Sequence, residues 1–309
     1  MATAVTHEQP GIVLNVDALV PQEMARRAED VGVRKARLPT VQAFVLAILA
    51  GAFISLGAAF STTVASGASN LLPYGVVRLL AGVSFSLGLV LVVVGGAELF
   101  TGNTLIVMAW AAGRLPLADM LRNWVVVYAG NLVGALGVAV LVFLSGQYAF
   151  GGGAVGLTAL SIANTKAALY WPEATALGVL CNLLVCLAVW MSLSARSTTD
   201  RILAVVPPIT AFVAMGFEHS VANMYFIPLG ILIRNLAPAG FWQSISRQPT
   251  DFGAVDWGGF VANLAPVTLG NVIGGAVLVA TVYWFVYLRG SEASELSGPV
   301  ERGRDGQQP

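Results

Sequence analysis

The stretch GFEHSVAN, residues 216–223, lies between the apolar segments VVPPITAFVAM (205–215) and YFIPLGILI (225–233). It places an acid, Glu218, and the only histidine outside the N-terminal segment, His219, in the middle of an apolar run. An ionisable side chain at membrane depth costs roughly 2.5–3.5 kcal/mol on insertion scales, so it indicates function. Irregular backbone at that depth is tolerated only where protein buries it or where it lines a cavity. The stretch therefore predicts a broken membrane span that forms part of a pore.

The composition of the whole chain supports a membrane environment. Of its 309 residues 57% are hydrophobic and 10% charged, and the mean hydropathy is +0.78, whereas soluble domains carry about 25% charge. Membrane lipid is thus an expected partner, and the formal net charge of zero argues against nucleic acid. Cys181 and Cys186 lie in one apolar run and are expected to serve only as packing residues.

Six apolar stretches are long enough to cross a bilayer. They cover approximately residues 41–60, 76–110, 119–145, 172–195, 200–233 and 260–288. The segments that would face one side of the membrane hold twelve Lys and Arg residues, while Arg78, Lys166, Arg234 and Arg247 would face the other. Because positive charge favours the cytoplasmic side, both termini are expected there, with the protein in the cytoplasmic (inner) membrane.

Three regions follow from this pattern. Residues 1–40 form a cytoplasmic segment with an amphipathic helix starting at Pro21, which either lies on the membrane surface or acts as a plug or gate. Residues 41–289 form the six-span channel domain, and the polar residues 290–309 form a disordered tail.

The opening stretch has a counterpart in the first half of the chain. GAELFTGN (96–103) shares its pattern G-x-E-x-x-x-x-N, and one span later GNLVGA (130–135) matches GNVIGG (270–275). Two matched pairs in the same order indicate a duplicated unit of three spans. Since three is odd, the second copy enters the membrane from the opposite side, which gives a 3+3 inverted repeat with broken second and fifth spans. The N-termini of the two half-helices would face a small anion or polar solute near the midplane.

Several side chains at the breaks are candidates for the pore chemistry. His219 either acts on the permeating species, poised rather than permanently charged, or is a neutral residue that ties the broken segments together. Glu98 and Glu218 are expected to accept hydrogen bonds from loop amides, with Asn103 and Asn223 as braces. Lys166, in a predicted loop, is either only solvated or attracts anions to a pore mouth.

Catalytic and metal-binding signatures are missing from the sequence. It contains no HExxH, GxSxG, CxxC or phosphate-loop motif. We therefore predict neither an enzyme nor a bound metal or cofactor.

Five segments resemble the formate/nitrite transporter family over approximately residues 21–289. They are GGAELFTGNTLIV, NWVVVYAGNLVGAL, CNLLVCLAVWMS, GFEHSVANMYFIPLGI and PVTLGNVIGGAVLV. Within that family the chain is most similar to the formate channels, including PQEMARRAEDVGVRKA, which resembles their gating N-terminal helix. The resemblance implies an aquaporin-like fold and a homopentamer with one pore per protomer.

The resemblance also implies roles for individual residues. Thr101 would face His219 across the pore, Glu218 and Asn223 would orient His219, Asn271 would line the path, and Lys166 would lie in the outer funnel. Leu89, Phe212 and Phe85 would form the outer constriction, and Leu99, Phe100 and Val185 the inner one. Glu98 stands where formate channels carry aspartate, which keeps the charge.

The function that these features imply is passive or proton-coupled passage of formate and related small monovalent anions. Nitrite, hydrosulfide, acetate and lactate are alternatives within the family. A neutral-solute pore for water or ammonia is the main rival outside it, and a scaffold that transports nothing would leave the paired polar breaks without a purpose.

Overall fold

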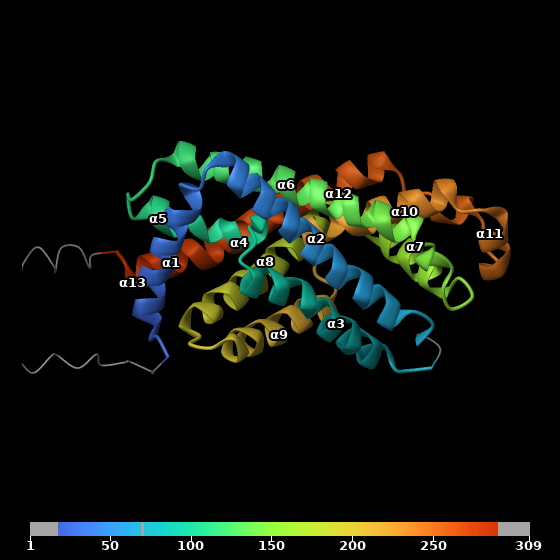
Figure 1. The fold of residues 1–309 in the computed structure, drawn as a ribbon, viewed down its shortest axis with the longest axis horizontal. Coiled ribbons are helices and arrows are strands. Elements are labelled where there is room, and N and C mark those ends of the chain that lie inside the picture. The colour runs from blue at the N-terminus through green and yellow to red at the C-terminus, as the bar shows by residue number, and fades with distance from the viewer. Residues whose placement is uncertain (1–17, 69–70, 290–309) are drawn as a thin grey trace, which may run out of the picture.

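The computed structural model describes residues 18–68 and 71–289, so the predicted disordered tail lies outside the described residues. Helices make up the described part of the chain, and none of it is a β-strand (Figure 1). This confirms the all-α membrane protein that the apolar stretches predict. The long helices are α2 (Thr40–Ala65), α3 (Tyr74–Gly95), α6 (Leu117–Leu144), α8 (Trp171–Ser194), α9 (Thr198–Met215) and α12 (Trp257–Val272), which continues through a π-helical stretch (Ile273–Thr281) into α13 (Val282–Tyr287).

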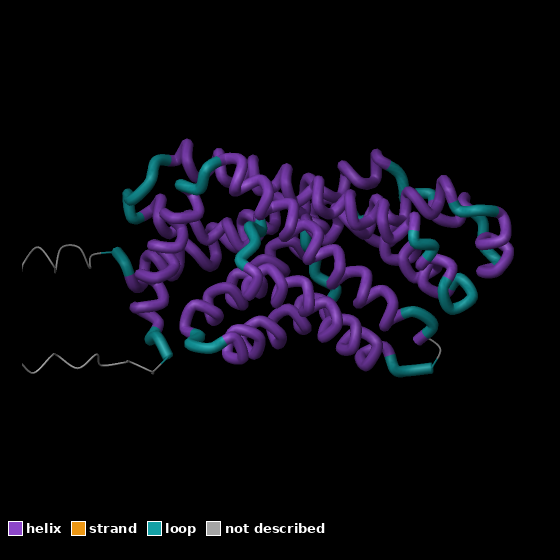
Figure 2. Tube along the Cα trace, viewed as in Figure 1, coloured by secondary structure: helices purple, strands orange, loops and turns teal. Residues whose placement is uncertain are grey.

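The second and fifth spans are broken, as predicted. After α3 the chain turns at Gly96, is extended at Leu99, and becomes helical again in α4 (Phe100–Asn103). A short 3-10 turn (Thr104–Ile106) and α5 (Val107–Ala111) follow. After α9 it turns at Gly216 and starts again as α10 (Ser220–Leu236). Both glycines have positive φ, 75° and 77°, a conformation that favours glycine and ends helices. Figure 2 shows the two loop segments in the middle of the molecule, away from the loops at its ends.

The two halves are built alike around these breaks. Helix α2 packs against α3 and α6, helix α8 packs against α9 and α12, and α3 and α9 contact each other at the centre. Each half is preceded by a shorter helix, α1 (Pro21–Ala36) or α7 (Ala154–Ala167), and these lie at opposite ends of the long axis (Figure 1). The duplicated unit therefore contains a short helix as well as three spans, and the opposite placement of α1 and α7 fits the inversion.

Glycines let the spans within each half approach closely. A methyl group at Gly134 would overlap the carbonyl oxygen of Ile48, and one at Gly274 would overlap that of Val179. The matched GNxxG segments thus allow α6 to pack on α2, and α12 with its π-helical continuation to pack on α8. The asparagine of each segment is thereby brought within reach of the neighbouring break.

Helix α1 packs against protein. Its apolar face, with Met24, Ala28 and Val33 buried, lies against the half-helix formed by residues 104–111 and against α13. Protein contacts thus take the place of the lipid contacts expected of a helix on the membrane surface. Arg114 pairs with the buried Glu29 at 3.2 Å and with the exposed Asp30 at 2.6 Å.

Beyond α10 the chain bends by 110° into α11 (Ala239–Ile245). A 3-10 turn (Pro249–Phe252) then leads to α12 at the end of the molecule that also carries α7 (Figure 1). These elements cover that end of the half-helix α10.

Candidate pore site

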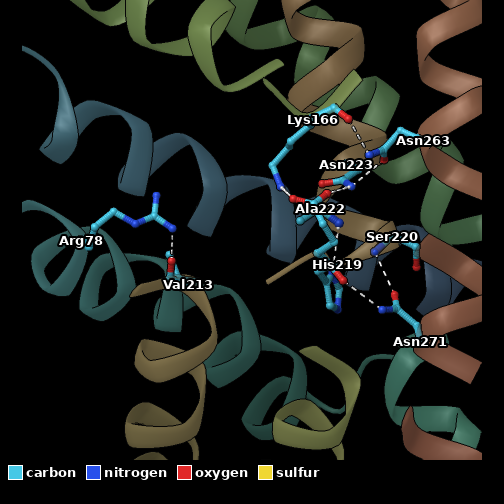
Figure 3. Close-up of polar contacts among 10 residues, drawn as sticks. Arg78, Lys166, Val213, His219, Ser220, Ala222, Asn223, Asn263 and Asn271 are labelled. Carbon is cyan, nitrogen blue, oxygen red and sulfur yellow. Dashed lines mark hydrogen bonds and ion pairs between the residues drawn. The ribbon is translucent and has the colours of Figure 1, made fainter. Parts of the chain in front are cut away.

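The ring of His219 lies where the two half-helices meet. His219 is the N-cap of α10, and its Nδ1 accepts the backbone N–H of Ala222 at 3.0 Å (Figure 3). Its Nε2 is 2.9 Å from Oγ1 of Thr101, in the first turn of α4. The ring stacks on Phe212 with centroids 6.0 Å apart. The two broken spans are therefore joined by a direct hydrogen bond between one polar side chain from each.

The hydrogen bonds fix the tautomer of this ring. Because Nδ1 accepts from Ala222, the neutral imidazole carries its hydrogen on Nε2 and donates it to Thr101 Oγ1. Thr101 is held in turn through its carbonyl oxygen, which accepts from Thr104 Oγ1 at 2.7 Å and from Asn182 Nδ2 at 3.2 Å. Asn182 is a positioning residue that was not predicted, since it lies in an unbroken span without a polar interruption.

Glu218 is bound by side chains from two helices, α7 and α10. Its carboxylate accepts hydrogen bonds from Nζ of Lys166 and from Nδ2 of Asn223, each at 2.7 Å. Asn223 also donates to Asn263, which donates to the backbone carbonyl of Lys166 at 2.8 Å and closes the ring of contacts (Figure 3). The expectation that loop amides satisfy this acid was wrong, because a lysine and an amide side chain occupy its two oxygens.

Lys166 was expected in a loop and instead occupies the last turn of α7. Its side chain is only 15% exposed, and its ammonium group lies 5.5 Å from the ring centroid of Phe226. The solvated alternative does not describe this side chain. Its charge is compensated by Glu218, so the pair as a whole adds no net charge.

The same arrangement recurs at the first break. The Glu98 carboxylate accepts hydrogen bonds from Nζ of Lys35 and from Nδ2 of Asn103, each at 2.7 Å. Asn103 donates to Asn123, which donates to the backbone carbonyl of Lys35 at 3.0 Å. Lys35 of α1 thus corresponds to Lys166 of α7. Extending the repeat upstream of the first and fourth spans would have identified Lys35 from the sequence.

Two asparagines anchor the backbone of the breaks. Asn271 donates to the carbonyls of Gly178 and Glu218 and accepts the N–H of Ser220, at 2.8, 2.9 and 2.9 Å. Asn131 makes the corresponding contacts with Ala47, Glu98 and Phe100 at 2.8, 2.9 and 2.9 Å. Both amides are fully buried. These contacts make Asn271 a brace of the break, and its predicted role in lining the path stays a prediction.

Within the described residues, the ring of His219 makes hydrogen bonds with Thr101 and Ala222, and its backbone carbonyl accepts the N–H of Asn223 at 3.0 Å. The side chains of Glu218 and Asn223 bind each other and make no hydrogen bond with the ring of His219. Their role in orienting His219 stays a prediction, and the hydrogen bond between Asn223 and His219 runs through the backbone.

Two cavities approach the site from opposite ends. The α7-side cavity has a volume of about 380 Å³ and reaches His219, and Phe85 and Phe212 line it. The α1-side cavity has a volume of about 600 Å³, and Leu89 and Leu99 line it. Leu89, assigned to the outer constriction together with Phe212, thus borders the other cavity.

Several side chains that were predicted to form the constrictions pack tightly in the structure. The rings of Phe85 and Phe212 meet edge to face at 5.5 Å. Phe100 packs edge to face on Tyr128 at 4.8 Å, and Val185 is buried in the core. Their role as constrictions stays a prediction.

Arg78, which was counted only among the charges that indicate orientation, lies in the lining of the α7-side cavity. Its guanidinium donates to the carbonyls of Ala214 and Val213, the last turn of α9 (Figure 3). Both acceptors are neutral, and a cation at a helix C-terminus is favourable. Arg78 has no acidic partner among the described residues, so it adds a positive charge to the cavity that reaches His219.

The fold and the site define an integral membrane protein of the transport class. Six spans enclose a polar centre between two cavities, and its polar groups are held by duplicated braces. The formate/nitrite transporter profile matches residues 22–285. The chain belongs to the formate/nitrite transporter family.

Individual relatives agree over nearly the whole chain. The formate channel FocA of Escherichia coli K12 is 47% identical over 274 residues, which cover 88% of this chain and 96% of the relative. A solved structure described as a pentameric formate channel with formate bound superimposes with a TM-score of 0.77 at 44% identity, covering 81% of this chain and 98% of that one. A solved FNT family ion channel superimposes with a TM-score of 0.69 at 32% identity, covering 85% and 98%.

Proposed function

We propose that this protein is a channel that moves formate and related small monovalent anions across the cytoplasmic membrane, as a homopentamer with both termini in the cytoplasm. The observation that carries the proposal is the Thr101–His219 contact at the meeting point of two half-helix N-termini. The pentameric, formate-bound structure and the FocA relatives support the substrate and the assembly. The twelve-to-four distribution of Lys and Arg supports the orientation, in which the α1-side cavity would face the cytoplasm.

The geometry suits an anion better than a neutral solute. A carboxylate that displaced the Thr101–His219 contact would accept hydrogen bonds from Nε2–H and from the threonine hydroxyl. Positive half-helix ends face the same point, and Arg78 adds charge on the approach. Nitrite fits these donors as well, and no contact favours it over formate.

Proton coupling would require a second state of His219. The imidazolium carries hydrogen on both ring nitrogens, so Nδ1 must give up the bond from Ala222 N–H, at a cost of about 1–3 kcal/mol. The Nε2 proton then moves to a carboxylate oxygen, which leaves a neutral ring protonated at Nδ1 and the neutral acid. The acid crosses the apolar residues more easily than the anion does, and protons from the acidic side recharge the ring.

The test is formate flux with proton movement in proteoliposomes at several pH values. His219→Asn should keep the pore open, because an asparagine oxygen can cap Ala222 N–H, and should lose the pH-dependent coupling of formate to protons. His219→Phe should strongly reduce flux. Wild-type coupling and pH profile in His219→Asn would show that His219 is only a brace. A parallel panel of nitrite, acetate, water and ammonia ranks the alternatives.

A further inference from the structure

We propose that the α1-side cavity binds a polyvalent phosphate-type anion that cannot pass the pore and blocks it from that side. The site is separate from the Thr101–His219 contact, and only the blocking effect rests on the proposed function.

The charge of the cavity wall is the first argument. Four basic side chains line it, against the single acid Glu98, for a formal charge of +3: Arg27, Arg34, Lys35 and Arg201. Arg78 and Lys166 line the α7-side cavity with Glu218, for a formal charge of +1. The field that attracts anions is therefore stronger at the α1 side, and it acts more strongly on a polyvalent anion than on a monovalent one.

Most of the basic side chains that line this cavity are unpaired within the described part of the chain, whereas nearby basic side chains are paired. Lys35 is bound by Glu98, but the side chains of Arg27, Arg34 and Arg201 make no hydrogen bond or ion pair with the described part of the chain. Arg114 and Arg122 on the same side are bound to Asp30 and to the Ala36 carbonyl.

The usual excess of positive charge on one side of a membrane protein does not require basic side chains from different helices to line the same cavity. Arg27 and Arg34 lie seven residues apart on α1, and Arg201 reaches the same cavity from the first turn of α9. Guanidinium groups suit this ligand because each can bind two phosphate oxygens at once.

The occupant would be trapped at the inner end of the path. The cost of moving an ion out of water rises with the square of its charge, so a dianion pays about four times the penalty of formate at the apolar residues. Leu89 and Leu99 border the cavity at that point. A polyvalent anion can thus enter but not pass, and it excludes formate while it is bound.

Pyrophosphate binding to the purified full-length protein tests the site without any transport assay. Calorimetry in detergent at matched ionic strength should show binding that weakens about tenfold in Arg27→Gln, Arg34→Gln or Arg201→Gln, the loss of about 1.4 kcal/mol. Arg37→Gln is the matched control. Arg37 follows α1 directly, is exposed, and does not line the cavity, so its replacement should change affinity less than twofold. Absence of wild-type binding, or equal losses in Arg34→Gln and Arg37→Gln, would overturn the site.

Sided block of formate flux tests the consequence. In proteoliposomes of measured orientation, pyrophosphate on the α1 side should raise the formate concentration for half-maximal flux. The same concentration on the α7 side should have little effect. Equal block from both sides refutes the proposed block. If the protein moves no formate at all, the calorimetric result still decides whether the anion site exists.

Discussion

Replacing Asn271 by leucine tests whether its amide holds the second break in place. The substitution keeps a similar volume and removes three hydrogen bonds, to the carbonyls of Gly178 and Glu218 and from the N–H of Ser220. Hydrogen bonds within membrane proteins contribute about 0.6 kcal/mol on average and up to about 1.7. Three of them give a loss of about 2–5 kcal/mol. The upper part of that range applies because the three partners remain buried without an acceptor or donor.

The free energy of unfolding can be measured by SDS titration in mixed micelles at one fixed protein concentration, since assembly makes stability concentration-dependent. Thr268→Val is the matched control: it lies less than one turn earlier on α12 and removes the single bond to Tyr128, at 2.7 Å. It should cost no more than about 1.7 kcal/mol. Formate flux of Asn271→Leu should also fall, because Ser220 follows His219 directly. An Asn271→Leu loss no larger than that of Thr268→Val, with full flux, would refute the reasoning.

Two further substitutions test the charge at the α7-side cavity and the packing of the halves. Lys166→Gln leaves Glu218 unpaired, so flux should fall mainly at low formate and recover in part at high salt or in the double variant Lys166→Gln/Glu218→Gln. A concentration dependence of flux that does not change would leave Lys166 a structural role alone. Gly134→Ala should destabilise by about 1–3 kcal/mol, because its methyl group overlaps the Ile48 carbonyl. Gly137→Ala on the same helix meets open space and should cost nothing in the same titration; equal effects of the two would contradict the close crossing.

Much of the fold could be predicted from the sequence because membrane spans have a strong local signal. The apolar stretches located the spans, and the glycine, acid and asparagine of each break located the two interruptions. The predicted first span ended at residue 60, whereas α2 continues to Ala65, since threonine and serine lower hydropathy without ending a helix.

The partners of the polar groups could not be predicted in the same way. Glu218 takes its partners from positions 52 residues earlier and 5 residues later, Lys166 and Asn223. Such contacts depend on how helices pack, which hydropathy does not report. Helix α7 was missed for a related reason: it is too short to span the membrane, so its residues were assigned to a loop.

The two copies of the repeat have closely similar breaks. The two breaks share their glycine, glutamate and asparagine, and their N-cap residues have nearly the same backbone conformation, φ −107° and ψ 125° at Leu99 and φ −114° and ψ 113° at His219.

The side chains at these N-caps nevertheless differ. Leucine stands where the other half has histidine, and Phe100 stands where the other half has Ser220, whose hydroxyl is buried without a partner in the described chain. The duplicated residues all make bracing contacts, so symmetry is retained where it stabilises the breaks. It is lost at the N-cap of each half-helix and at the residue that follows it. A symmetric pair of histidines would place two polar rings in one narrow apolar site. The single ring opposite Thr101 leaves one pair of donors there, and in the channel that we propose this pair would bind one small anion at a time.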